Sequence, residues 1–148
     1  MGARALGAGL DLRAQIARAA LDEIIVHARV EAPSECCGLL LGTGLAITEA
    51  ARTTNIASNR YSRFLIDPKQ HIDIRRDARA RGIEVVGFYH SHPRSPAMPS
   101  TSDLAEATYP GHLYLIVSLA FERPAVSIYR LDDGGAGNFL HLPLVTVR

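Results

Sequence analysis

Short apolar runs bounded by glycine, proline or asparagine alternate along this chain with two longer segments in which apolar residues recur every three or four positions. The first of these helical segments begins at Leu12 and ends at Pro33. The second follows Asp67 and Pro68, an N-cap residue and a proline suited to the first helical position, and Gly82 provides its stop. Hairpins and crossovers are therefore mixed, which predicts an α+β fold class with a mixed sheet flanked by helices.

The apolar runs between these helices have the length and turn boundaries of strands. Strands are expected over residues 37–42, 45–51, 61–66, 83–89, 113–119, 125–131 and 139–147. The first two form a plausible hairpin around Gly42 and Gly44, and a short third helix is expected over residues 100–108. A turn is expected from Asp132 to Gly135.

The chain has 148 residues, enough for one domain that buries about 68–70% of its unfolded surface. We expect residues 1–10, which are rich in alanine and glycine, to form a flexible tail, and residues 11–148 to form the domain. A net charge of +1 without a dense basic block argues against a nucleic-acid partner. No apolar run approaches the ~20 residues that cross a bilayer, so no membrane partner is expected. The sequence does not indicate an oligomeric state.

The two cysteines, Cys36 and Cys37, are adjacent in the sequence. Neighbouring cysteines rarely reach disulfide geometry without backbone strain, so a secreted disulfide framework is not expected. A strand also sends adjacent side chains to opposite faces, which prevents the pair from sharing one metal ion easily. We therefore predict a cytoplasmic protein in which both thiols pack in the interior.

A candidate metal site lies at the end of the expected strand over residues 83–89. His90 and His92 stand two positions apart, so both imidazoles can face one ion while Ser91 faces away. A proline-rich stretch leads to Asp103, at the head of a short helix, which can supply a third ligand. Two histidines and one carboxylate leave a fourth tetrahedral position open, as in catalytic zinc sites. Such an ion lowers the pKa of its bound water towards ~7.

Two further residues are candidates for catalysis. Glu35, just before a buried strand, is the carboxylate best placed to act as general base and then as general acid. Ser100 has a hydroxyl near the expected metal, where it can donate a hydrogen bond to a developing oxyanion.

Each of these residues also has a simpler interpretation. His90 and His92 can be two histidines at a strand edge, and Glu35 can be a solvated loop acid. Ser100 and Asp103 have the spacing of an N-terminal capping arrangement, in which both side chains satisfy helix N–H groups. The two interpretations are compatible for Ser100, but Asp103 cannot give its full lone-pair capacity to both. The four remaining histidines have no partner at ligand spacing, so structural or surface roles are expected for them.

Taken together, Glu35, the run from His90 to Pro93, Ser100 and Asp103 resemble the JAMM motif of the MPN+ metalloproteases. The segments 35–42 and 64–68 also resemble those of the small prokaryotic members, so the likeness covers nearly the whole chain. It implies a fold similar to that of cytidine deaminases. It also implies a zinc-dependent peptidase or isopeptidase in which His90, His92 and Asp103 bind zinc, Glu35 is the acid and base, and Ser100 assists the oxyanion.

The small prokaryotic branch includes hydrolases that release cysteine from the C-terminal Gly-Gly end of a ubiquitin-like sulfur-carrier protein. The resemblance therefore implies a ubiquitin-like or sulfur-carrier tail as substrate, bound beside an exposed strand. Pro93 follows His92 as in the wider family, whereas the cysteine-releasing members have a different residue there. The fold family also includes members that lack the metal ligands and act as protein-interaction modules, which is the alternative function.

Overall fold

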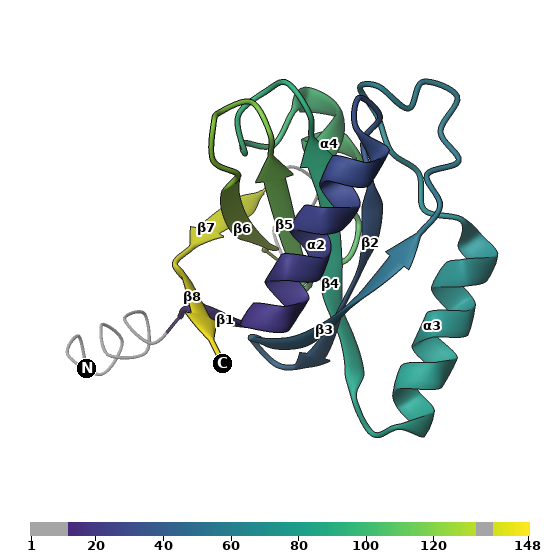
Figure 1. The fold of residues 1–148 in the computed structure, drawn as a ribbon. Coiled ribbons are helices and arrows are strands. Elements are labelled where there is room, and N and C mark those ends of the chain that lie inside the picture. The colour runs from purple at the N-terminus through teal and green to yellow at the C-terminus, as the bar shows by residue number, and fades with distance from the viewer. Residues whose placement is uncertain (1–11, 133–137) are drawn as a thin grey trace.

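The strands of the protein form one mixed sheet, seen in a computed structural model that describes residues 12–132 and 138–148. The strands are β1 (Ala14–Ala17), β2 (Cys37–Thr43), β3 (Ala46–Thr53), β4 (Glu84–His92), β5 (Leu113–Ser118), β6 (Ala125–Leu131), β7 (Phe139–Leu142) and β8 (Leu144–Val147), and the helices are α2 (Arg18–Glu31), α3 (Pro68–Ala80) and α4 (Thr101–Glu106). The eight strands lie in the order β7-β6-β5-β4-β2-β3-β1-β8 (Figure 1). This confirms the α+β fold class.

Both faces of the sheet carry an apolar core, because side chains alternate along each central strand. On one face, Leu113 and Leu115 of β5 pack in the same cluster as Ile24 of α2. On the other face, Tyr114 of β5 packs in the same cluster as Ala78 of α3. The two longer helices therefore cover opposite faces, and β4 lies between β2 and β5 in the middle of the sheet. No helix of the described residues is long and apolar enough to cross a membrane.

The beginning of the described chain corrects one prediction. Residues 14–17 form a strand rather than the first turns of the expected helix, and α2 starts only at Arg18. β1 pairs in parallel with both β3 and β8. Hydrogen bonds to two neighbouring strands outweigh the helical periodicity of this short segment, which is a tertiary effect.

Two other strand predictions were wrong. Residues 61–66 are not a strand; Ile66 alone forms an isolated bridge, to Asn55. Residues 139–147 form two strands, β7 and β8, instead of the single strand expected, because Pro143 lies between them and has no N–H to donate. The two strands lie at opposite edges of the sheet. Part of the turn expected at 132–135 and the tail expected at 1–10 lie outside the described residues.

The start of α3 follows the predicted capping pattern. The side chain of Asp67 accepts hydrogen bonds from the backbone N–H groups of Lys69, at 2.9 Å, and Gln70, at 3.4 Å, and Pro68 occupies the first helical turn. Replacing Asp67 with alanine is expected to lower the free energy of unfolding by about 1 kcal/mol, because two N–H groups lose their acceptor. Urea denaturation monitored by circular dichroism measures the change. An unchanged midpoint would contradict the proposed contribution of the cap.

Candidate metal centre and active site

The last residues of β4 bring two histidines to one face of the sheet. His90 and His92 are 3% and 4% exposed. Both are paired with residues of β5, whereas the pairing of β4 with β2 ends at His90. Ser91 points to the opposite face, as predicted, and its Oγ accepts a hydrogen bond from the N–H of Cys36 at 2.8 Å. The alternation of the strand therefore separates the two imidazoles from the residue between them.

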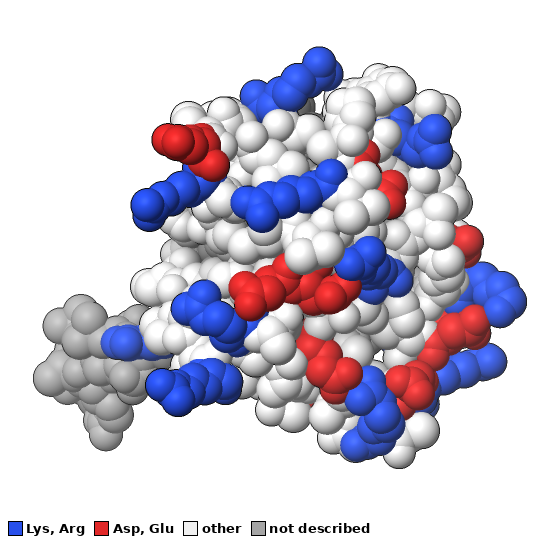
Figure 2. All heavy atoms as spheres, viewed as in Figure 1, with Lys and Arg blue, Asp and Glu red and all other residues white. Residues whose placement is uncertain are grey.

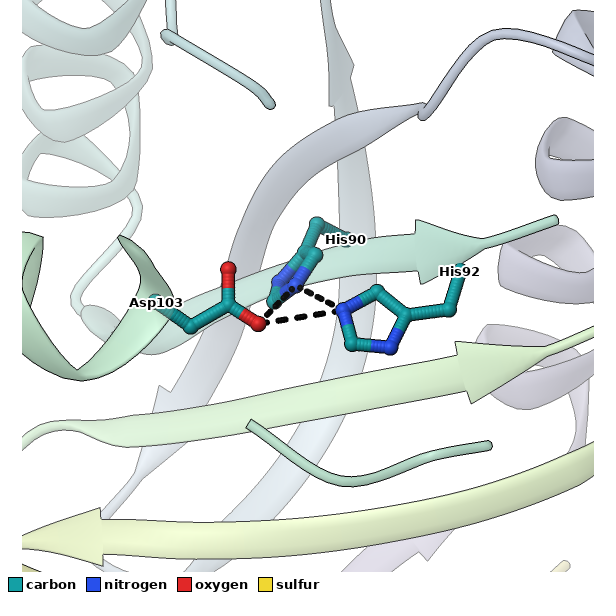
Figure 3. Close-up of side chains that lie close together, drawn as sticks. All are labelled: His90, His92 and Asp103. Atoms are coloured by element: carbon teal, nitrogen blue, oxygen red, sulfur yellow. Dashed lines mark hydrogen bonds and ion pairs between the residues drawn. The ribbon is translucent and has the colours of Figure 1, made fainter. Parts of the chain in front are cut away.

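Asp103 completes a compact cluster with the two histidines (Figure 3). Its Oδ2 lies 3.1 Å from Nε2 of His90 and 3.0 Å from Nε2 of His92, and the two Nε2 atoms lie 3.1 Å apart. All three side chains direct one ligand atom towards a common point. Within the described residues, this is the one group of three or more histidine, cysteine or acidic side chains with a metal-site geometry.

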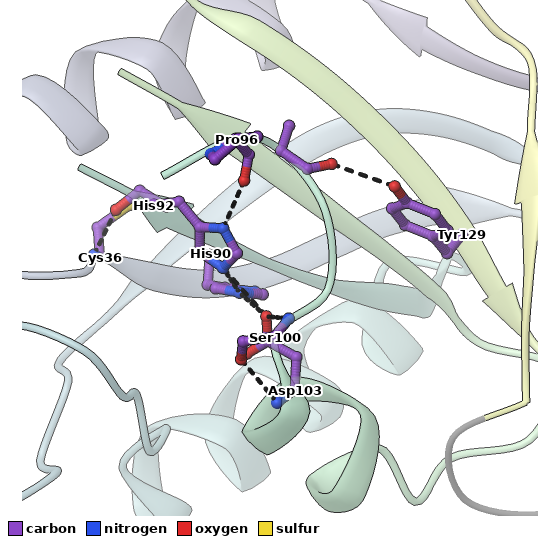
Figure 4. A network of polar contacts seen from close by, with 9 residues as sticks. Cys36, His90, His92, Pro96, Ser100, Asp103 and Tyr129 are labelled. Atoms are coloured by element: carbon purple, nitrogen blue, oxygen red, sulfur yellow. Dashed lines mark hydrogen bonds and ion pairs between the residues drawn. The ribbon is translucent and has the colours of Figure 1, made fainter. Parts of the chain in front are cut away.

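The proline-rich loop after β4 orients His92 (Figure 4). Nδ1 of His92 lies 2.8 Å from the carbonyl oxygen of Pro96, which can only accept, so Nδ1 carries the proton. In the neutral ring, Nε2 then has a free lone pair directed towards Asp103. The loop is held by two further donors, since Ser118 Oγ donates to Ser95 O at 2.6 Å and Tyr129 Oη donates to Ala97 O at 3.1 Å. Fixing the tautomer of a ligand histidine in this way is typical of metal sites.

Ser100 and Asp103 form the capping box that their spacing allowed. The N–H of Asp103 donates to Ser100 Oγ at 3.0 Å, and the N–H of Ser100 donates to Asp103 Oδ2 at 2.9 Å. The box begins α4 and also fixes the carboxylate that faces the histidines. The capping and the metal-binding interpretations therefore describe the same geometry, and the hydroxyl hydrogen of Ser100 stays free to donate.

Glu35 lies beside this cluster through the register of β2 and β4. Cys37 is paired with His90 in an antiparallel ladder, so continuing the register by two residues brings Glu35 next to His92 on the same face. The side chain is 6% exposed, and its Oε1 has no hydrogen-bond partner within the described part of the chain. Glu35 is therefore a buried acid at the metal site rather than the solvated loop acid of the simpler interpretation.

Comparisons with known proteins identify the family. The model for prokaryotic homologs of the JAB domain matches residues 17–132 of the chain. The chain belongs to this family. It is 38% identical over 112 residues to a desampylase of Haloferax volcanii, across 72% of this chain and 81% of the relative. It is 30% identical over 116 residues to a CysO-cysteine peptidase of Mycobacterium tuberculosis, across 77% and 80%.

Solved structures of JAB-family and related proteins share the fold. A solution structure from Desulfitobacterium hafniense has a TM-score of 0.79 and 28% identity, covering 90% of this chain and 92% of that one. A JAB1/MPN domain protein from Archaeoglobus fulgidus has a TM-score of 0.61 and 21% identity, covering 93% and 99%, and this likeness shows the fold alone. Together with the His90, His92 and Asp103 group, family membership makes the chain a JAMM-type peptidase, as the sequence predicted.

The chemistry of the JAB-family cluster suits a zinc ion. Two neutral imidazole nitrogens and one carboxylate oxygen are the donors of a three-residue zinc site with an open position. Burial would raise the pKa of Asp103, but its hydrogen bonds with His90 and His92 outweigh burial and hold that pKa well below the ordinary value. The carboxylate is therefore ionised, which is the form that binds a cation.

The pKa values of the two histidines are shifted in opposite directions. Burial lowers the pKa of His90, which favours the neutral, ligating ring. Burial acts in the same direction on His92, but the contacts with Asp103 and Pro96 outweigh it and raise the pKa.

Burial also raises the pKa of Glu35, to about 7, against the lowering effect of His92. A carboxyl group with this pKa can both accept and return a proton near neutral pH.

An apolar cavity of about 460 Å³ adjoins the metal cluster. His90 and Asp103 form part of its wall, and aromatic side chains form much of the rest: Phe64, Phe88, Tyr109, Tyr114 and Phe139. The ring of Phe64 stacks on His90 with centroids 4.3 Å apart and planes at 21°. Sequence reasoning missed this contact, although it singled out the segment around Phe64 as similar to the family.

Both cysteines, and two of the histidines outside the metal cluster, have contacts that indicate structural roles. Cys36 and Cys37 are buried and unpaired, as predicted, and burial raises the pKa of their thiols to about 12 and about 11. Nδ1 of His27 lies 2.7 Å from the hydroxyl of Tyr89 in the interior. His71 accepts a hydrogen bond from Nε of Arg75 at 2.8 Å. None of these four residues is part of the metal cluster.

Figure 2 shows how charge is distributed on one face of the molecule. Lysine and arginine side chains alternate there with aspartate and glutamate, and neither sign covers a continuous area. This even distribution agrees with the net charge of +1.

Proposed function

We propose that this protein is a zinc-dependent peptidase or isopeptidase that hydrolyses the amide bond at the C-terminal Gly-Gly end of a ubiquitin-like or sulfur-carrier protein. The observation that carries the proposal is the convergence of His90, His92 and Asp103 beside the buried acid Glu35. Two relatives support the substrate class, since their names describe a desampylase and a CysO-cysteine peptidase. A cytoplasmic location is part of the proposal, in keeping with the unpaired thiols of Cys36 and Cys37.

In this proposal the three cluster residues hold zinc, which when bound acts as a Lewis acid towards the scissile carbonyl and towards water. Glu35 takes a proton from the attacking water and gives a proton to the leaving amine. Ser100 donates its hydroxyl hydrogen to the oxyanion that develops on the carbonyl, while its Oγ keeps accepting the N–H of Asp103. The capping box thereby fixes the position of the donor before substrate arrives.

The cavity beside the cluster suits an apolar stretch of the substrate tail. A Gly-Gly end has no side chains and can pass close to buried metal ligands. The residues before it can then place apolar side chains among Phe64, Phe88 and Tyr114, which line the cavity.

The direct test is intact-mass analysis of a Gly-Gly-ending sulfur carrier extended by one cysteine, after incubation with zinc-loaded protein. A second substrate is the same carrier joined to a lysine side chain by an isopeptide bond. With the wild type, the first carrier is expected to lose the mass of one cysteine residue and the second to be released as the free carrier; with Glu35→Ala neither change is expected. If zinc is bound and neither substrate is cleaved, the alternative of a non-catalytic interaction module is supported instead.

Turnover is expected to fall as the pH drops below neutrality, together with bound zinc. Protons compete with the metal for Nε2 of His90 and His92, and because the pKa of His92 is raised above 6.5, competition begins near neutral pH. Rate and zinc content are measured on the same samples between about pH 5 and pH 8. A fall of the rate at low pH with zinc fully retained would contradict metal release as its cause. The fall would then be assigned to protonation of Glu35, which must be ionised to act as base.

A further inference from the structure

The position of Glu35 depends on its main chain. Its Oε1 is buried without a hydrogen-bond partner among the described residues, so no hydrogen bond of that atom holds the side chain in place. The main chain, in contrast, is held on both sides by the segment after β3. Its N–H donates to the carbonyl oxygen of Arg60 at 2.7 Å, and its carbonyl oxygen accepts from Nδ2 of Asn55 at 3.0 Å.

The side-chain amide of Asn55 uses its full hydrogen-bonding capacity at this point. Besides Glu35 O, Nδ2 donates to the carbonyl oxygen of Arg63 at 3.0 Å. Oδ1 accepts from the N–H groups of Ala57 and Leu65, each at 3.0 Å. Two donated and two accepted bonds are the most that an amide group can make in this geometry. The three bonds within the segment fix the amide, and the fourth reaches across to Glu35.

We propose that Asn55 is a positioning residue for Glu35, because its amide fixes the main chain of the acid and thereby the place of the carboxylate next to the metal cluster. This inference rests on the proposed role of Glu35 as acid and base. A misplacement of about 1 Å at a reacting group can lower a rate about 10²-fold, so one main-chain contact has a measurable effect.

A purely structural role for Asn55 would have a different consequence. The segment that Asn55 organises also contributes Phe64, Leu65 and Ile66 to the wall of the apolar cavity. If the amide served only to shape this wall, its loss would weaken substrate binding and raise KM. If it positions Glu35, its loss lowers kcat, because the proton transfer is impaired while the cavity and the ligands remain.

Asn55→Asp and Asn55→Ala separate these possibilities. Aspartate keeps both acceptor bonds, from Ala57 and Leu65, so it retains more of the local fold than alanine does. It loses both donors, and its charge repels the carbonyl of Glu35. For both variants we expect kcat to fall about 10–100-fold with KM within about twofold of the wild type and one zinc bound. Asn59→Ala is the matched control, since Asn59 lies in the same segment and, within the part of the chain that the structure describes, its side chain accepts from Tyr61 N–H alone, at 3.3 Å. It is expected to behave as the wild type.

A double-mutant cycle with Glu35→Gln tests whether Asn55 acts through Glu35. If it does, adding Asn55→Ala to Glu35→Gln lowers the residual rate no further. An additional fall by the full factor seen in the wild-type background, or a rise in KM with kcat unchanged, would overturn the proposal.

A measurement without turnover keeps the test independent of the substrate. In protein labelled with carbon-13 at the glutamate carboxyl groups, zinc binding to the wild type is expected to shift the Glu35 resonance, assigned by its absence in Glu35→Gln. In Asn55→Asp this shift is expected to shrink while zinc affinity stays the same. A shift equal to that of the wild type would overturn the proposal, even if no carrier protein is cleaved by any variant.

Discussion

Replacing Glu35 with glutamine is expected to lower kcat by about 10²–10⁴-fold while one zinc ion stays bound. Glutamine preserves the size of the side chain but cannot accept a proton from water. The three side chains of the metal cluster are unchanged, and Glu35 is outside the group with ligand geometry. The pKa of about 7 makes Glu35 suited to both halves of the reaction, since the same carboxyl group must lose and regain a proton in each turnover.

Steady-state cleavage of the carrier, together with zinc analysis of the same preparation, measures this effect. Glu31→Gln is a suitable control, because Glu31 is an exposed acid at the end of α2, four residues from Glu35 in the sequence. It is expected to leave both rate and zinc content unchanged. If Glu35→Gln kept the wild-type rate, the assignment of Glu35 would fail, although the metal site would stand.

Replacing His90 with alanine is expected to remove both zinc binding and turnover. In the proposed site the imidazole is one of the three ligands that the described residues supply, and the ring also stacks on Phe64. Zinc that binds only the folded state stabilises it by about 2.7 kcal/mol at 100 times its dissociation constant. Added zinc should therefore raise the melting temperature of the wild type and leave that of His90→Ala unchanged.

Calorimetric zinc titration and thermal melting check this prediction without any substrate. His141→Ala is the control, since His141 is an exposed histidine that stacks on Tyr129 and lies outside the cluster. It should bind zinc as the wild type does. Stoichiometric zinc binding by His90→Ala, with an affinity equal to that of the wild type, would show that the metal is held elsewhere.

Much of this protein could be predicted from local patterns. The boundaries of α3 follow from Asp67, Pro68 and Gly82, because caps and stops are properties of a few adjacent residues. His90 and His92 share a face because side chains alternate along any strand. The α+β fold class, the three metal-binding candidates and the catalytic candidates Glu35 and Ser100 could therefore be inferred before the structure was known, and the family resemblance joined these five residues into one motif.

Other features depend on contacts between distant segments. Residues 14–17 are a strand because β3 and β8 lie on either side of them, and residues 61–66 are irregular although their composition favours a strand. The tautomer of His92 is set by the carbonyl of Pro96, and the main chain of Glu35 by the amide of Asn55. The sequence by itself determined which residues are candidates for the chemistry and most of the local elements that hold them. Only the tertiary structure decided their distances, protonation and supporting contacts, because hydrogen bonds and burial between remote segments leave no local pattern in the chain.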